Sequence, residues 1–176
     1  QYNVQSSEKE KFDGVMLDIE PYISDSWKEN PEEYMDRYIS CMKKGYKFAQ
    51  KNHLRTAICI PRHYDNQGLT SGLEELIKET CDEVAVMNYS CGNEIEAIRT
   101  EAALSEKYGK ELHCILEFQE VGKHGLTENK TYRNKGIDNA KETWEKLQKE
   151  YKNINVTRDY HWSRPVREML EEKNAD

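Results

Sequence analysis

Five apolar segments, each followed by a stretch with helical periodicity, recur along the whole chain. The apolar segments cover residues 13–20, 54–61, 82–90, 111–121 and 154–162. Apolar runs bounded by polar and turn-forming residues are typical of strands buried in a sheet. Because a helical crossover between two strands of one sheet leaves them parallel, the alternation predicts a parallel sheet with right-handed connections.

The helices between these strands are predicted from their capping residues and apolar stripes. Pro31 suits the first position of a helix that ends near Asn52. Asn30 would cap this helix, and Glu33 would complete a capping box. Apolar side chains recur along it at helical spacing, which predicts one buried stripe. A second capping box, Ser71 and Glu74, opens the next predicted helix, and further helices are expected over residues 94–108, over residues 136–151 and from Pro165 onward.

No linker, repeat or low-complexity segment interrupts this series. Residues 1–176 are therefore expected to form one domain, with residues 1–11 as a polar lead-in. Two architectures fit the alternation, an open doubly wound sheet and part of a (β/α) barrel. No glycine-rich phosphate loop follows any predicted strand, which disfavours the nucleotide-binding form of the open sheet. We therefore expect an α/β fold like a TIM barrel, incomplete, with five consecutive β/α units where a closed barrel has eight.

The charge of the chain limits the partners that it is expected to bind. Its 176 residues carry a net charge of −7, and 34% of them are charged. This acidic balance argues against nucleic acid or an anionic membrane as a partner. No segment is long and apolar enough to cross a bilayer, and none resembles a signal peptide. Because the first residue is Gln rather than Met, we expect a processed or excised chain, and the compartment stays open.

The five cysteines are spread along the chain without a metal-binding pattern. There is no CxxC motif and no Cys/His cluster, so we expect no zinc site, no other metal and no cofactor. Isolated cysteines in odd number favour thiols that are mostly reduced. They are Cys41, Cys59, Cys81, Cys91 and Cys114.

The first predicted strand, within the segment FDGVMLDIEPY, ends in two acids. Side chains alternate along a strand, so Asp18 and Glu20 share one face with Met16, while the residues between them face the helices. The carboxyl ends of parallel strands are where barrels and open α/β sheets build their binding sites. The two acids are therefore the first candidates for a functional site.

The same alternation assigns the inner faces of the other strands. Each becomes polar or aromatic on that face as it nears its carboxyl end. For the last strand two assignments stay open, with either Tyr160 and Trp162 or Asp159 and His161 on the inner face. The inner residues of the three middle strands are Ala57, Cys59 and Pro61; Ala85, Met87 and Tyr89; and His113, Ile115, Glu117 and Gln119.

The first strand resembles the fourth-strand signature of family 18 glycoside hydrolases, the chitinase-like barrels. That signature runs Asp-Gly-x-x-Asp-x-Asp-x-Glu, or nearly so. The later segment VMNYS is similar to the sixth-strand Met-x-Tyr-Asp of the family, and a tryptophan near the last strand has a counterpart in the floor of its sugar site. The residues that carry the resemblance are Asp13, Gly14, Asp18, Glu20, Met87, Tyr89 and Trp162.

The resemblance implies roles for the two acids and a substrate class. Glu20 would be the general acid that protonates the glycosidic oxygen. Asp18 would orient the acetamido oxygen of an N-acetylhexosamine, which attacks the anomeric carbon in place of an enzyme carboxylate. Such substrate-assisted hydrolysis is an exception to the two-carboxylate scheme of most glycosidases. The implied partner is thus a carbohydrate, in a secreted or cell-surface setting.

Further residues would bind the sugar. Tyr89 would form a hydrogen bond with the acetamido group, and Trp162 or Tyr160 would stack on a sugar ring. Asp13 belongs to the matched signature and is included among the binding residues. Glu117 and Gln119 would line the cleft.

The chain also departs from the family pattern. Met16 stands where the family has its middle acid, and Ser90 where it has the sixth-strand Asp. If the first strand here is the fourth of the family, the chain corresponds to the second part of a barrel.

These departures keep alternatives open. The chain could be a non-catalytic glycan-binding domain, or an inactive barrel fragment whose open edges are covered by a second copy or another chain. Lysozyme-like muramidases are the runner-up among enzymes. In a purely structural role, the two acids would cap the next turn or pair with Arg55 or Arg62.

Overall fold

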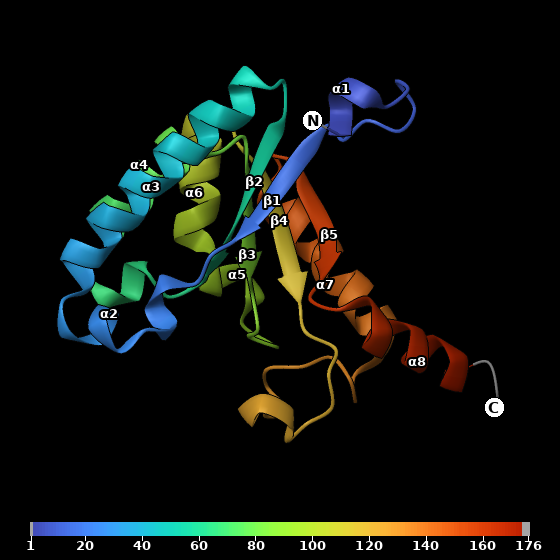
Figure 1. Cartoon of the computed structure of the whole chain (residues 1–176). Coiled ribbons are helices and arrows are strands. Elements are labelled where there is room, and N and C mark those ends of the chain that lie inside the picture. The colour runs from blue at the N-terminus through green and yellow to red at the C-terminus, as the bar shows by residue number, and fades with distance from the viewer. Residues whose placement is uncertain (1, 174–176) are drawn as a thin grey trace.

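Five parallel strands alternate with helices in the predicted order (Figure 1). The computed structural model describes residues 2–173. An α/β fold with an all-parallel sheet is therefore confirmed. The strands are β1 (Gly14–Asp18), β2 (Arg55–Pro61), β3 (Glu83–Met87), β4 (Glu111–Leu116) and β5 (Val156–Tyr160).

The strands lie side by side in the order in which the chain forms them, β1-β2-β3-β4-β5. Because every connection is a crossover between neighbouring parallel strands, one shared hand of crossover places the connecting helices on the same face of the sheet. In the described part of the chain, β1 and β5 form the two edges of the sheet.

The helices vary from single turns to a long amphipathic helix. None of the described helices is long and apolar enough to cross a membrane. The α-helices are α1 (Tyr2–Gln5), α2 (Asp25–Glu29), α3 (Pro31–Lys51), α4 (Thr70–Thr80), α5 (Glu94–Ala97), α6 (Arg99–Tyr108), α7 (Gly136–Glu150) and α8 (Ser163–Lys173), and the short 3₁₀ turns are η1 (Pro21–Ile23), η2 (Asp65–Gln67) and η3 (Lys123–Gly125).

The start of α3 confirms the predicted cap. The Asn30 side-chain oxygen accepts the backbone N–H of Glu33 at 3.4 Å, and its amide donates to the Glu33 carboxylate at 2.8 Å. The second predicted capping box is wrong, because α4 begins at Thr70 and Ser71 lies inside the helix. The chain enters α4 from the η2 turn through Leu69, which is buried and directly precedes the helix. The Leu69 carbonyl accepts the first helical N–H, from Leu73 at 2.9 Å.

The single helix predicted over residues 94–108 is divided into α5 and α6 at Ile98. The buried side chain of Asn88 donates a hydrogen bond to the backbone oxygen of Glu94 at 2.9 Å. In an unbroken helix that oxygen would accept the N–H of Ile98. Ile98 bonds to Ile95 instead, at 3.4 Å, and the helix restarts from there.

The fourth strand ends at Leu116 rather than near residue 121. One oxygen of the Glu117 carboxylate accepts the backbone N–H groups of Phe118 and Gln119, each at 2.8 Å. These N–H groups are then no longer available to a neighbouring strand, and the chain turns into the loop that contains η3. The last strand is likewise shorter than predicted, and α8 begins two residues before Pro165.

The two faces of the sheet differ in what covers them. On the helix-covered face the apolar side chains of β2, β3 and β4 are fully buried in the main core, whereas Leu17 of β1 is only partly buried. The opposite face, called the open face below, has only a small apolar cluster of Cys59, Ala85 and Ile115, with Met87 and Tyr89 against it. On β1 it exposes 53% of Met16. The predicted alternation is therefore confirmed for β2, β3 and β4.

All five strands point in one direction, so their carboxyl ends meet at one edge of the molecule. Figure 1 shows the arrowheads converging there, where the loops that follow β1 and β4 also lie. This edge, on the open face, is where the predicted site residues gather.

Candidate functional site

Asp18 is the last residue of β1 and lies beside Cys59 of the neighbouring strand. The register pairs the two residues directly. Burial, and after it the charge and hydrogen bond of Asp18, raises the pKa of the Cys59 thiol to about 12. The thiol is therefore protonated at neutral pH. Asp18 itself is exposed on the open face.

Glu20 follows the strand and is half-buried. Its backbone oxygen accepts the N–H of Ile23 at 3.3 Å, which closes the η1 turn. Its carboxylate lies beside the Tyr22 hydroxyl, and burial together with the hydrogen bond to Glu20 raises the pKa of that tyrosine. Within residues 2–173 neither Asp18 nor Glu20 forms an ion pair with an arginine, and Arg55 pairs with two other acids.

Glu117 follows β4 and is 2% exposed. One of its oxygens accepts the two backbone N–H groups that end the strand. The other accepts hydrogen bonds from His161 Nδ1 at 2.7 Å and from the Gln119 amide at 3.1 Å. Burial alone would raise the pKa of Glu117, but the hydrogen bonds from His161 and Gln119 lower it on balance. Glu117 is therefore an ionised anchor for His161.

His161 follows β5 and presents 45% of its side chain to solvent. The hydrogen bond to Glu117 raises the pKa of His161 against the effect of burial, and the charges of Glu117, Asp18 and Glu20 raise it further. An imidazolium is thus favoured at this point of the open face. Of the two alternatives for the last strand, the structure places Asp159 and His161 on the open face, since they contact His113 and Glu117.

Tyr89 lies between these groups. Its ring centroid is 5.6 Å from that of His161. Its hydroxyl is buried and has no hydrogen-bond partner within residues 2–173. Burial, then the charge of Glu117, raises the pKa of Tyr89, so the hydroxyl keeps its proton. A buried hydroxyl that lacks a partner costs free energy, which a polar group of a ligand would recover.

A cavity of about 610 Å³ opens beside Tyr89 and His161. Its volume lies in the range of small-molecule sites. Trp162 forms part of the wall with 47% of its surface exposed, and the Arg164 guanidinium lies 5.9 Å from its ring centroid. The lining is completed by Glu117, Gln119, His124, Gly125, Leu126 and Lys130.

The structure brings most of the predicted site residues together. Tyr89, Glu117, Gln119 and Trp162 line the cavity, whereas Asp18 and Glu20 are not among its lining residues. The charges of these two acids act on His161 from the carboxyl end of β1. Two other predicted residues lie away from this group.

Tyr160 and Asp13 lie outside this site. Tyr160 is paired in register with Leu116, whose side chain belongs to the helix-covered face, and Tyr160 does not line the cavity. Asp13 precedes β1 at its opposite end, where its backbone oxygen accepts the N–H of Arg55 at 2.9 Å. Although Asp13 matches the family motif, it therefore lies where the chain enters β1.

His161 was outside the predicted set of site residues, although the alternation offered it as one of two possibilities. The point at which β5 ends decides which of its residues lie at the carboxyl ends of the strands. The pairing of β5 with β4 sets that point. His161 is held there because its backbone N–H donates to the oxygen of Leu116 at 3.0 Å. The sequence signal that would have found it is the HW pair that ends the last predicted strand, at the carboxyl end where sites are built.

Comparisons of the chain with protein-family models, with curated proteins and with solved structures find no match. The resemblance to family 18 glycoside hydrolases thus rests on the motif residues alone. Within residues 2–173, this region combines two carboxylates without ion pairs, a histidine held by a buried carboxylate, a buried hydroxyl without a hydrogen-bond partner and an open cavity.

Proposed function

We propose that this chain carries a glycoside hydrolase site that acts on an N-acetylhexosamine-containing glycan. One observation carries the proposal: Asp18 and Glu20, which have no arginine partner in the described part of the chain, lie at the carboxyl end of β1 near the Glu117–His161 pair. Acids left without counter-ions at this edge of a parallel sheet are available to a substrate.

The proposed reaction uses Glu20 as the proton donor. Asp18 holds the acetamido group so that its oxygen attacks the anomeric carbon. The bond from that carbon to the glycosidic oxygen breaks as Glu20 protonates the oxygen. Water then attacks the cyclic intermediate, Glu20 takes a proton from this water, and the sugar is released with its configuration retained.

The neighbouring residues would bind the sugar. The Tyr89 hydroxyl, which lacks a partner in the described chain, suits a hydrogen bond to the acetamido group. Trp162 offers an exposed ring for stacking on a sugar at the wall of the cavity. The imidazolium of His161 would donate a hydrogen bond to a sugar hydroxyl, and Glu117 fixes its orientation.

We further infer that the five β/α units are a segment of a (β/α) barrel. The strands follow one another around the sheet in chain order, as in a barrel, and the helices lie on one face. On this reading the open face is the interior side of the barrel.

Hydrolysis of a chromogenic N-acetylglucosamine oligomer tests the proposal. Glu20→Gln keeps the size of the side chain but removes its proton, and turnover is expected to fall at least about 100-fold. Glu29→Gln is the matched control, since Glu29 is an exposed acid at the end of α2, and it should keep wild-type turnover.

Two outcomes would contradict the enzyme. Saturable binding of the oligomer without turnover, lost in Trp162→Ala, would identify a non-catalytic glycan-binding domain on the same scaffold. If the wild-type chain neither binds nor hydrolyses the oligomer, the glycan proposal is wrong for this chain.

A further inference from the structure

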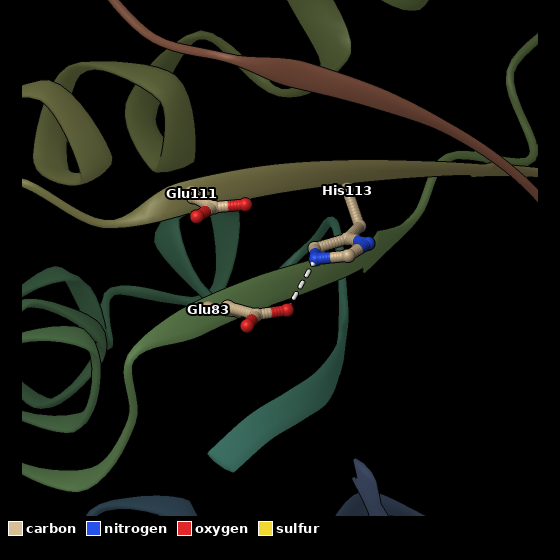
Figure 2. Close-up of side chains that lie close together, drawn as sticks. All are labelled: Glu83, Glu111 and His113. Carbon is tan, nitrogen blue, oxygen red and sulfur yellow. Dashed lines mark hydrogen bonds and ion pairs between the residues drawn. The ribbon is translucent and has the colours of Figure 1, made fainter. Parts of the chain in front are cut away.

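A second group of titratable side chains lies on the open face, at the amino-terminal ends of β3 and β4. Figure 2 shows Glu83 on one strand facing Glu111 and His113 on the next. Glu83 and Glu111 are partners in the register, and His113 lies two residues further along β4. One ligand atom from each of the three side chains can be chosen so that all lie within 4.8 Å of one another.

The orientation of His113 is fixed by a carboxylate on the far side of the ring. Nδ1 lies 2.6 Å from Asp159 Oδ2, and the Thr157 hydroxyl donates to the same oxygen at 3.1 Å. Nε2 is thereby directed at Glu83, with 2.8 Å between Nε2 and Oε2. A carboxylate behind a histidine is how proteins orient metal-binding imidazoles.

Arg55 holds the other oxygens of the two glutamates. Its Nε donates to Glu83 Oε1 at 2.6 Å and its Nη2 to Glu111 Oε1 at 2.9 Å. Each carboxylate therefore keeps its second oxygen for another partner. The arginine positions both acids from outside the three-residue group, and its side chain is 54% exposed.

The charges of this region favour a cation. Glu83, Glu111 and Asp159 carry three negative charges, and Arg55 supplies one positive charge. With a neutral His113 the group has a net charge of −2. The side chains of His113 and Glu83 are only 14% and 18% exposed, so screening by solvent is weaker here than on a free surface.

We propose that Glu83, Glu111 and His113 bind a divalent transition-metal ion, with Zn²⁺ as the best fit. Imidazole nitrogen and carboxylate oxygen are both ligands of zinc, whereas Mg²⁺ is held by carboxylates, carbonyls and water and rarely accepts imidazole. The ion takes the place of a proton between His113 and Glu83, whose 2.8 Å separation must widen, because ligands of tetrahedral zinc lie about 3.4 Å apart.

The remaining coordination position faces the open side of the sheet. Glu111 is 43% exposed, so water reaches the ion from that side. This site is independent of the proposed glycosidase site, because it uses different residues and no step of that reaction passes through it.

Titration of EDTA-treated protein with Zn²⁺, followed by calorimetry, tests the site. We expect one ion per chain, a rise in the melting temperature with added Zn²⁺, and affinity for Mg²⁺ at least about 100-fold weaker. His113→Gln and Glu111→Gln should each weaken Zn²⁺ binding at least about 10-fold. The control is His53→Asn, which removes an exposed histidine at a positive φ that asparagine tolerates.

Glu111→Gln keeps the test meaningful if His113→Gln fails to fold, because it leaves both hydrogen bonds of His113 in place. As a positioning residue, Asp159 is tested by Asp159→Asn, which should alter the visible spectrum of bound Co²⁺ and weaken Zn²⁺ binding about 10-fold. The proposal is overturned if the wild-type chain binds no Zn²⁺, if both ligand variants bind as tightly as it does, or if Mg²⁺ binds equally well.

Discussion

Two histidines lie on the open face, and the protein uses their rings to different extents. His161 bonds through Nδ1 to Glu117 and presents 45% of its side chain to solvent. His113 bonds through both ring nitrogens, to Asp159 and Glu83, and is 14% exposed. The free nitrogen of the His161 ring can still contact a substrate. The His113 ring can bind a new partner, such as a metal ion, only if that partner replaces the proton between Nε2 and Glu83.

The carboxylates that contact the two rings also differ, in how deeply they are buried. Glu117 is buried and accepts four hydrogen bonds, so it serves to position His161. Glu83 and Glu111 share one arginine at the surface. A histidine–carboxylate pair with one free ring nitrogen can still contact a ligand, whereas a ring engaged at both nitrogens suits a structural role or, with its proton replaced, the proposed metal site. Substitutions in the two groups can separate these roles.

The largest expected effect on stability comes from the buried carboxylate. Glu117→Ala removes four accepted hydrogen bonds and leaves His161 and Gln119 without their partner, so we expect a loss of about 3 kcal/mol in the free energy of unfolding. Urea denaturation measures it. Glu111→Ala is the counterpart in the other group, and there the loss should stay below about 1 kcal/mol because the pair is exposed. Equal losses would contradict the comparison.

The next effect concerns activity. His161→Gln should lower kcat/KM for the N-acetylglucosamine oligomer about 10- to 100-fold. Glutamine can occupy the position of the ring, but it offers the substrate no positive charge. The measurement is steady-state turnover, with circular dichroism to verify folding. His53→Asn, which replaces an exposed histidine after α3, is a control that should leave kcat/KM unchanged. A wild-type rate in His161→Gln would remove this residue from the site.

The pH dependence of stability reports on the carboxylate partners of both rings. Hydrogen bonds to Asp159 and to Glu117 raise the pKa values of His113 and His161 above their ordinary value of 6.5. A pKa that is higher in the folded state gives stability that is complete below pH 6.5 and is lost as pH rises through the folded pKa.

We therefore expect the unfolding free energy of metal-free protein to decrease above pH 6.5. His113→Gln and His161→Gln should each flatten this decrease, and the double variant should flatten it most. Glu117 acts oppositely: its lowered pKa gives stability that is present above its ordinary value of 4.5 and lost as pH falls through the folded pKa. Urea titrations at a series of pH values provide the test, and an unchanged slope in both variants would refute it.

The smallest expected effect is that of Arg55→Met. The arginine is 54% exposed, so its ion pairs contribute little, and we expect a loss of about 0.5 kcal/mol. Zn²⁺ should still bind to the variant, since Arg55 contributes no ligand atom. A loss above about 2 kcal/mol would show that the metal-free group depends on the arginine as a buried pair would.

Much of the fold followed from local patterns. Period-two alternation identified the inner faces of β2, β3 and β4, and the Asn30 cap located the start of α3. These features depend on neighbours in the sequence. The start of α4 and the break at Ile98 were missed, because long-range contacts decide both: Asn88 reaches from the end of β3 to the first turn of α5.

Local patterns in the sequence predicted the parallel sheet, the two faces of β2, β3 and β4, and the position of Asp18 and Glu20 at the carboxyl end of β1. The order of the strands and the contacts between distant residues became visible only in the three-dimensional structure: His161 meets Glu117 at the carboxyl ends of the strands, and His113 lies between Glu83 and Asp159 nearer the amino-terminal ends of β3 and β4. The physical reason is register. Alternation says which face a side chain occupies, but its neighbours across the sheet are set by hydrogen bonds between strands and by where each strand ends, and no local pattern encodes these.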